Sequence, residues 1–379
     1  MKLYLNQNVL DAALDRIRWL YDEFEIVVCN ISGGKDSTIC LNLTLQVAEE
    51  RNRLPLKVMF IDQEAEWNSV IEHLRDIFAD PRIEPYWLQV PIKIFNATSH
   101  LDQWLHCWEI GKEDQWMREK EDIAIKENIY GTDRFGVMFE KFFQVQFPNQ
   151  KACYIAGMRA QESPTRYYAL TGGHTYKGVT WGRVETAKME QYAFYPIYDW
   201  ETNDVWKTIH NKKWDYCKLY DVYYQYGVPI KNMRVSNVHH ETAIASMLWL
   251  QEIEGDTWEK LTQRISGINT AGQMAKNFYC PSKVPFMFKD WREYRDYLLE
   301  HLIVDKENAE KFRKSFARQE ESMIPAIHED LIKSQTSSLI TNDYHGTKMA
   351  SFMAANAHYS IGGKRAKRGI FHAKMKFND

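Results

Sequence analysis

The 379-residue sequence predicts an α/β fold with a mostly parallel sheet, followed by a helical C-terminal domain. Two observations lead to this prediction. Short apolar runs rich in β-branched residues alternate with helix-periodic segments over residues 20–210, as in consecutive strand–helix units. From about residue 215 helical spacing continues without such runs. We therefore expect a sheet domain over 1–214, a helical domain over 215–335 and a basic tail over 336–379.

The first strand runs directly into a glycine-rich turn. An amphipathic helix over 8–24 precedes a strand over 26–31, and another helix follows the turn. Two consecutive glycines permit positive φ and remove the Cβ atoms that would keep a ligand away from the backbone. The turn therefore predicts a phosphate site at a helix start, formed by Ser32, Gly33, Gly34, Lys35, Asp36 and Ser37.

Two charged residues of this turn are candidate catalytic groups. Lys35 supplies a mobile positive charge, and Asp36 could hold a Mg²⁺ ion that bridges phosphate oxygens. The alternative interpretation is an ordinary Gly-Gly turn with a polar helix cap. The spacing excludes the longer G-x-x-x-x-G-K-[ST] loop.

The second strand, over 57–62, ends in acidic residues. Because ligands gather at the carboxyl ends of parallel strands, Asp62 and Glu64 are expected on the same rim as the glycine turn, where carboxylates could orient a ribose or share a metal. The alternative is a solvated acidic turn that caps the next helix. A third strand is expected over 86–90.

Residues 95–150 interrupt the strand–helix alternation. This insertion is rich in aromatic and charged residues, among them Trp116 and Arg118, and its periodicity is weak. A long insertion on the strand-end side of an α/β sheet is a natural substrate cover, and its tryptophans and arginines would suit a base, a nucleotide or another planar anion. The alternative is a helical excursion whose tryptophans fill a second small core.

Two later segments supply further candidates. After a strand beginning at residue 152, Gly157 allows close backbone approach, and Arg159 and Arg166 flank Ser163 as donors for a phosphate or sulfate oxygen. A structural ion-pair loop is the alternative. After the last predicted strand, Asp199 is expected on the rim of the site.

Composition restricts the class of protein. A net charge of −3 argues against a surface that coats nucleic acid, although the basic tail remains a candidate contact. The six cysteines form no C-x-x-C pair, and we find neither a signal peptide nor an apolar run of about 18 residues. We therefore expect a cytoplasmic protein without membrane association.

The glycine turn resembles the SGGxDS signature of the PP-loop ATP pyrophosphatase superfamily. That resemblance implies a doubly wound, adenine nucleotide α-hydrolase-like sheet and cleavage of ATP between its α- and β-phosphates. The G-x-R-x-x-E-S-x-x-R string at 157–166 and the P-I-x-D-W…D-V-W string at 196–206 are similar to those of the phosphoadenosine phosphosulfate (PAPS) reductase branch. The resemblance implies an adenine nucleotide, ATP or PAPS, with Asp62 near it, Arg159, Ser163 and Arg166 near its phosphate or sulfate, and Asp199 on the rim.

One family feature is missing. Sulfonucleotide reductases attack with a C-terminal cysteine in an E-C-G-L-H motif, whereas the last cysteine here, Cys280, lies in Tyr-Cys-Pro-Ser. The leading hypothesis is therefore an ATP-cleaving enzyme that adenylates an acceptor, with Lys35 and Arg159 stabilising charge on pyrophosphate. Sulfonucleotide reduction or sulfo transfer is the alternative within enzymes.

Residues 215–335 resemble the IbrA-type proteins of phages and mobile elements, through strings such as Leu-Tyr-Asp-Val-Tyr-Tyr at 219–224. This resemblance implies a ParB-like partner and opens a third hypothesis, a nucleotide-sensing co-regulator whose basic tail contacts DNA. A homo-oligomer, with the tail docked on a neighbouring subunit, is also compatible with the sequence.

Overall fold

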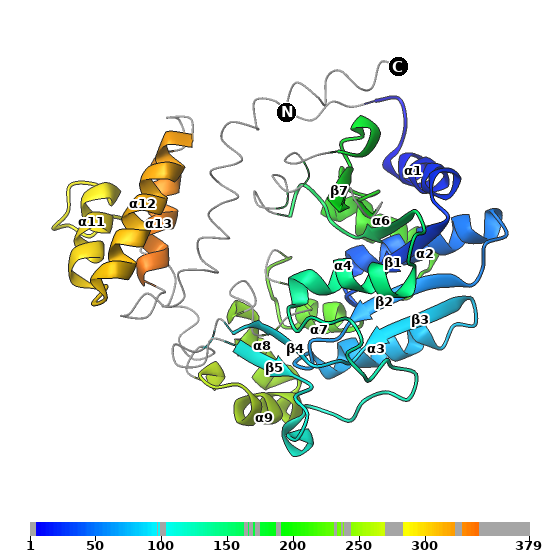
Figure 1. The fold of residues 1–379 in the computed structure, drawn as a ribbon, viewed down its shortest axis with the longest axis horizontal. Helices are drawn as coiled ribbons and strands as arrows, with labels where there is room; N and C mark the ends of the chain where they lie inside the picture. The colour runs from blue at the N-terminus through cyan, green and yellow to red at the C-terminus, as the bar shows by residue number, and fades with distance from the viewer. Residues whose placement is uncertain are drawn as a thin grey trace.

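The computed structural model describes a sheet domain and a series of C-terminal helices (Figure 1). The described residues are 5–96, 98, 104–162, 166, 170, 175–186, 191–230, 233–235, 238, 244–269, 283–322 and 328–340. Ser163, Cys280 and the basic segment 362–379 lie outside them, so the predictions made for these residues stay predictions.

A six-stranded sheet with the order β3-β2-β1-β6-β8-β7 forms the centre of the fold. Its strands are β1 (Ile26–Asn30), β2 (Leu56–Ile61), β3 (Ile83–Leu88), β6 (Ala152–Ala156), β7 (Gly182–Thr186) and β8 (Gln191–Phe194). All neighbouring pairs are parallel except β7 with β8. The predicted α/β fold with a mostly parallel sheet is therefore confirmed.

The apolar character of the central strands is explained by their burial between helices. In β1 the central residues Val27, Val28 and Cys29 are buried, as expected for a central strand covered by helices. The third strand begins at Ile83 rather than at the predicted residue 86, so it includes Pro85. A proline is tolerated there because β3 is the edge strand of the sheet, and the isolated bridge on its other side joins Leu88, not Pro85, to Ile125.

Helices flank the sheet and share its core. They are α1 (Val9–Glu23), α2 (Lys35–Glu50), α3 (Asn68–Phe78), α4 (Phe135–Gln146) and α6 (Thr202–Lys212). The predicted helix over 8–24 is confirmed as α1, whose N-cap Asn8 accepts a hydrogen bond from the Asp11 N–H at 2.9 Å. Ile17 of α1, Leu43 of α2 and Leu74 of α3 are fully buried in one hydrophobic cluster with the strands.

The insertion between β3 and β6 contains a second, small sheet. Strands β4 (Ile92–Phe95) and β5 (Trp104–Cys107) pair antiparallel, and a short 3₁₀ helix, η1 (Glu113–Gln115), follows. Another 3₁₀ turn, η2 (Tyr176–Gly178), precedes β7. Trp108 is fully buried in the main core, so at least this tryptophan of the insertion serves packing.

The C-terminal helices belong to two hydrophobic cores. Helices α7 (Leu219–Gln225), α8 (Ile244–Ile253) and α9 (Gly255–Arg264) contribute to the core of the sheet domain. Helices α11 (Trp291–His301), α12 (Lys306–Ser322) and α13 (His328–Ile340) enclose a separate core around Phe312 and Phe316 (Figure 1). Helices α7, α8 and α9 therefore pack on the sheet domain.

Within the described ranges, no helix combines the length and the apolar character needed to cross a bilayer.

Candidate functional site

The glycine turn lies at the carboxyl end of β1 and leads into α2. Gly33 has φ +71°, and a Cβ atom on it would lie 2.6 Å from a Val70 methyl carbon, so a larger residue would be strained and crowded there. Ser32 is exposed, and Gly34, Lys35 and Asp36 are half-buried, which leaves one face of the turn open. We call residues 32–37 the glycine loop.

The glycine loop lies where the strand order reverses. From β1 the chain continues to β2 and β3 on one side, then returns to β6 on the other. In open α/β sheets, ligands bind at the carboxyl ends of strands at such a reversal. Gly157, just after β6, meets the glycine loop there: a Cβ atom on it would lie 2.5 Å from the backbone of Asp36 and Ser37. Glycine is thus required for the two segments to touch.

Backbone N–H groups of the glycine loop are available to a ligand. The Ser32 N–H donates to the Ser37 hydroxyl at 3.2 Å, and that hydroxyl donates to the Gly34 carbonyl at 2.8 Å, which fixes the turn. The N–H groups of Gly33, Gly34, Asp36 and Ser37 donate to none of the described residues. Together with the N-terminus of the 16-residue helix α2 they form an anion-binding concavity.

Both oxygens of the Asp36 carboxylate face cations. Oδ1 accepts a hydrogen bond from Arg159 Nε at 2.5 Å, and Oδ2 lies 3.2 Å from Lys35 Nζ. A Mg²⁺ ion needs oxygen ligands that are free to coordinate it. Among the described residues no cluster of three or more His, Cys, Asp or Glu could hold a metal. Both Asp36 oxygens are thus engaged by cations of the chain itself, and the role of Asp36 as a magnesium ligand stays a prediction.

The Arg159 side chain is buried and contacts the glycine loop through Asp36. Only 3% of its side chain is exposed. Its backbone N–H donates to Glu162 at 2.9 Å, and Glu162 also lies 3.6 Å from Arg166, whose side chain is 48% exposed. Of the two predicted arginines, the structure thus brings Arg159 to the glycine loop and leaves Arg166 in an ion pair on the surface.

Asp199 faces helix α1. Its carboxylate accepts two hydrogen bonds from Arg16, at 2.8 and 2.7 Å, and Arg16 also donates to the Pro196 carbonyl at 2.6 Å. This bidentate pair joins the segment after β8 to α1. The contacts of the Asp199 carboxylate among the described residues are thus to Arg16, and none of them is to the glycine loop.

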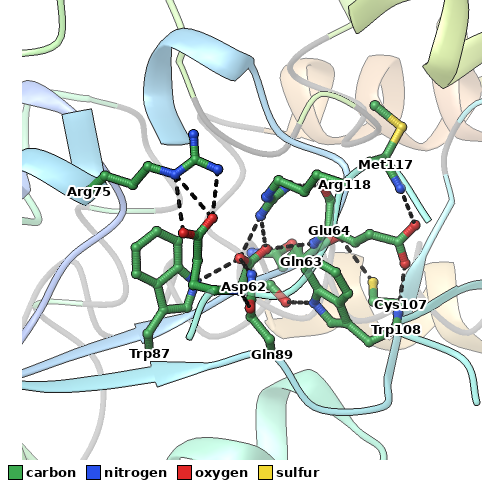
Figure 2. Close-up of polar contacts among 11 residues, drawn as sticks. Asp62, Gln63, Glu64, Arg75, Trp87, Gln89, Cys107, Trp108, Met117 and Arg118 are labelled. Atoms are coloured by element: carbon green, nitrogen blue, oxygen red, sulfur yellow. Dashed lines mark hydrogen bonds and ion pairs between the residues drawn. The ribbon is translucent and has the colours of Figure 1, made fainter. Parts of the chain in front are cut away.

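The acidic residues Asp62 and Glu64, after β2, are buried, and Figure 2 shows their polar contacts. Asp62 is fully buried, and its carboxylate accepts hydrogen bonds from Trp87 Nε1 at 2.8 Å, Gln89 Nε2 at 2.9 Å and Arg118 at 2.5 and 2.6 Å. Glu64 N–H donates to the same carboxylate at 2.9 Å. Every lone pair that a ribose or a metal would use is already engaged.

Glu64 is held in the same manner. It is fully buried, has φ +64°, and accepts hydrogen bonds from the Trp108 N–H at 2.6 Å and from Arg264 Nε at 2.6 Å. Arg264 comes from α9, 200 residues later in the chain. Asp62 and Glu64 therefore join β2 to the insertion and to α9 through their hydrogen bonds. Both are buried and do not lie on an open rim.

Two contacts from the C-terminal helices could not be found from local sequence patterns. The hydroxyl of Tyr220, in α7, accepts a hydrogen bond from the Lys35 N–H at 3.2 Å. Glu254, just before α9, accepts from the N–H groups of Asn68 and Ser69 at 2.8 and 3.0 Å and so caps α3. Because these partners are distant in sequence, no spacing rule indicates them.

The described cysteines are all buried thiols. Burial raises the pKa of Cys29 to about 12 and that of Cys217 to about 11. It also raises the pKa values of Cys40, Cys107 and Cys153 well above the usual range. A thiol acts as a nucleophile only as the thiolate, so none of these five is poised for attack.

Comparison with known proteins divides the chain in two. A family model for the phosphoadenosine phosphosulfate reductase domain matches residues 26–226, and one for a domain of unknown function, DUF3440, matches residues 227–350. An Escherichia coli K12 protein called uncharacterized protein YbdN is 30% identical over 330 residues, which cover 83% of this chain and 80% of that protein.

Solved structures give weaker likenesses. Candida glabrata FMN adenylyltransferase is 16% identical with a TM-score of 0.35; the match covers 57% of this chain and 62%, less than two thirds, of that chain. The phosphate complex of phosphoadenylyl-sulfate (PAPS) reductase from Candida auris is 14% identical with a TM-score of 0.30 and covers 59% of this chain and 94% of that chain. At these TM-scores neither likeness carries an argument.

Proposed function

The chain belongs to the phosphoadenosine phosphosulfate reductase domain family, and from this membership we propose that its glycine loop binds the phosphates of an adenine nucleotide. The observation that carries the proposal is the set of N–H groups of Gly33, Gly34, Asp36 and Ser37, which donate to none of the described residues and lie at the sheet's strand-order reversal. N–H groups and a helix N-terminus favour an anion such as a phosphate. Lys35 adds a positive charge at the edge of the same concavity.

We further propose that the nucleotide is ATP and that the reaction is adenylyl transfer. An oxygen of the acceptor attacks the α-phosphorus, the bond from that phosphorus to the α–β bridging oxygen breaks, and pyrophosphate leaves with the bonding electrons. Lys35 and the N–H groups of the glycine loop stabilise the negative charge that develops on pyrophosphate. Asp36 keeps Lys35 in place through the 3.2 Å contact.

In this proposal five of the other predicted residues, named below, act indirectly. Arg159 holds Asp36 in position, because its buried guanidinium donates to the Asp36 carboxylate. Gly157 lets the two loops meet. Asp62, Glu64 and Asp199 fix the surrounding segments through their arginine partners.

Sulfonucleotide chemistry is the second candidate, because the matching family is described by PAPS reductase. The five buried thiols among the described residues argue against attack on a sulfate by any of them. The resemblance of residues 215–335 to IbrA-type proteins supports a third proposal, in which the chain acts with a ParB-like partner. These residues overlap the DUF3440 match over 227–350.

Calorimetric titration of the full chain with ATP and with PAPS tests the proposal. ATP binding, followed by release of pyrophosphate and formation of an adenylylated acceptor when a cell-extract fraction supplies the acceptor, supports adenylyl transfer. A strong preference for PAPS supports the second candidate. Absence of binding by both nucleotides would refute the phosphate site itself.

A further inference from the structure

Tyr220 places a hydroxyl against the backbone of the glycine loop. Its oxygen accepts the Lys35 N–H at 3.2 Å and lies 3.5 Å from where a Cβ atom of Gly34 would be. The Lys35 ammonium lies 5.2 Å from the centre of the Tyr220 ring. This side chain, which comes from outside the sheet, therefore touches the group of N–H donors that we assign to phosphate binding.

The hydrogen of this hydroxyl has no acceptor among the described residues, although Tyr220 is only 5% exposed. A phenol carries one donor and two acceptor lone pairs, and a buried donor is normally paired. The neighbouring tyrosines follow that rule: Tyr216 donates to the Asp221 carboxylate at 2.7 Å, and Tyr223 donates to the Arg234 carbonyl at 2.8 Å. Tyr220 is the exception among these three.

From this difference we propose that Tyr220 is a phosphate ligand, which accepts the Lys35 N–H and donates its own hydrogen to a nucleotide phosphate oxygen. The inference rests on the proposed function and adds a residue to the site from the chain segment after the sheet. A phosphate oxygen on the glycine loop supplies the acceptor that the protein lacks. The hydroxyl then bridges the loop backbone and the ligand.

The surroundings of Tyr220 suit this role. Burial and the nearby Asp36 carboxylate raise the pKa of Tyr220 well above its usual value, so the phenol stays a neutral donor near an anion. Its ring packs edge-on against Trp206 of α6, at 5.2 Å between ring centres. A ring held in this way keeps the hydroxyl in position before the ligand arrives.

Tyr220→Phe removes the hydroxyl and retains the ring contacts with Lys35 and Trp206. Tyr223→Phe is the matched control. It removes a buried hydroxyl from the same helix, but this hydroxyl donates its hydrogen to the Arg234 carbonyl. Calorimetry with ATP, inorganic tripolyphosphate and adenosine separates phosphate contacts from base contacts. Melting curves of all three proteins establish that they are folded.

We expect Tyr220→Phe to weaken ATP and tripolyphosphate binding by roughly tenfold or more, as for a lost hydrogen bond to a charged group. Adenosine binding and the Tyr223→Phe control should match the wild type. Unchanged or tighter tripolyphosphate binding by Tyr220→Phe, with a wild type that binds ATP, overturns the inference and leaves the proposed function intact. A wild type that binds neither ATP nor tripolyphosphate overturns both.

Discussion

The ion pair between Glu64 and Arg264 gives the sharpest test of how α9 is joined to the sheet. Glu64 is fully buried, and the Arg264 side chain is 8% exposed. Arg264→Met keeps most of the side-chain volume but leaves the buried carboxylate without its cation. The variant therefore measures the free energy of breaking the pair rather than that of emptying a space.

The expected magnitude follows from the contacts that remain. Removing one partner of a buried pair costs about 3–5 kcal/mol of unfolding free energy. Glu64 keeps hydrogen bonds from the N–H groups of Trp108 and Met117, at 2.6 and 3.3 Å, so we expect the lower end of that range. Arg264 also donates to the His106 carbonyl at 2.5 Å, and losing that bond adds about 1 kcal/mol. The total is about 4 kcal/mol.

Urea unfolding, followed by circular dichroism at pH 7, measures this difference. Arg18→Met is the control, because it breaks an ion pair with Glu50 in which the side chains are 35% and 36% exposed; we expect a loss of about 0–1 kcal/mol. The double variant Glu64→Gln with Arg264→Met should recover much of the loss, since no unpaired charge is left buried. Equal losses for Arg264→Met and Arg18→Met, or no recovery in the double variant, would refute the account of this junction.

Two further predictions concern Gly157, which touches the glycine loop, and His73 of α3, which lies beside Thr38 of α2. Gly157→Ala places a methyl group 2.5 Å from the Asp36–Ser37 backbone, so we expect about 1–3 kcal/mol of destabilisation and weaker ATP binding; wild-type values for both would contradict the close contact. His73 is buried beside Thr38, and burial lowers its pKa, so the folded protein keeps it neutral while the unfolded chain takes up a proton below about pH 6.5. Stability should therefore fall as the pH drops below about 6.5, by at most about 1.4 kcal/mol per pH unit from this residue, until the lowered native pKa is reached. His73→Gln should remove that component when unfolding free energies at pH 7.5 and 5.5 are compared, and an unchanged pH dependence would contradict it.

Local patterns predicted much of the fold. The helix α1 and the strands β1 and β2 follow from apolar spacing within each segment, because each element buries a face against the sheet core. The sequence predicted that Gly157 allows a close backbone approach; the structure shows that the glycine loop makes this approach, because β6 lies parallel to β1.

The partners of the charged residues could not be predicted in this way. Arg118 reaches Asp62 across 56 residues, Arg16 reaches Asp199 across 183, and Arg264 reaches Glu64 across 200. A carboxylate at a strand end has the same local signature whether it binds a ligand or an arginine from elsewhere in the chain. Only the tertiary structure identifies which of these applies.

A crystal structure of the full chain soaked with a non-hydrolysable ATP analogue tests the central claim most directly. We predict triphosphate density on the N–H groups of Gly33, Gly34, Asp36 and Ser37, with Lys35 against it. A glycine loop that stays empty at saturating analogue, or nucleotide bound at another place on the chain, would contradict the assignment of this site.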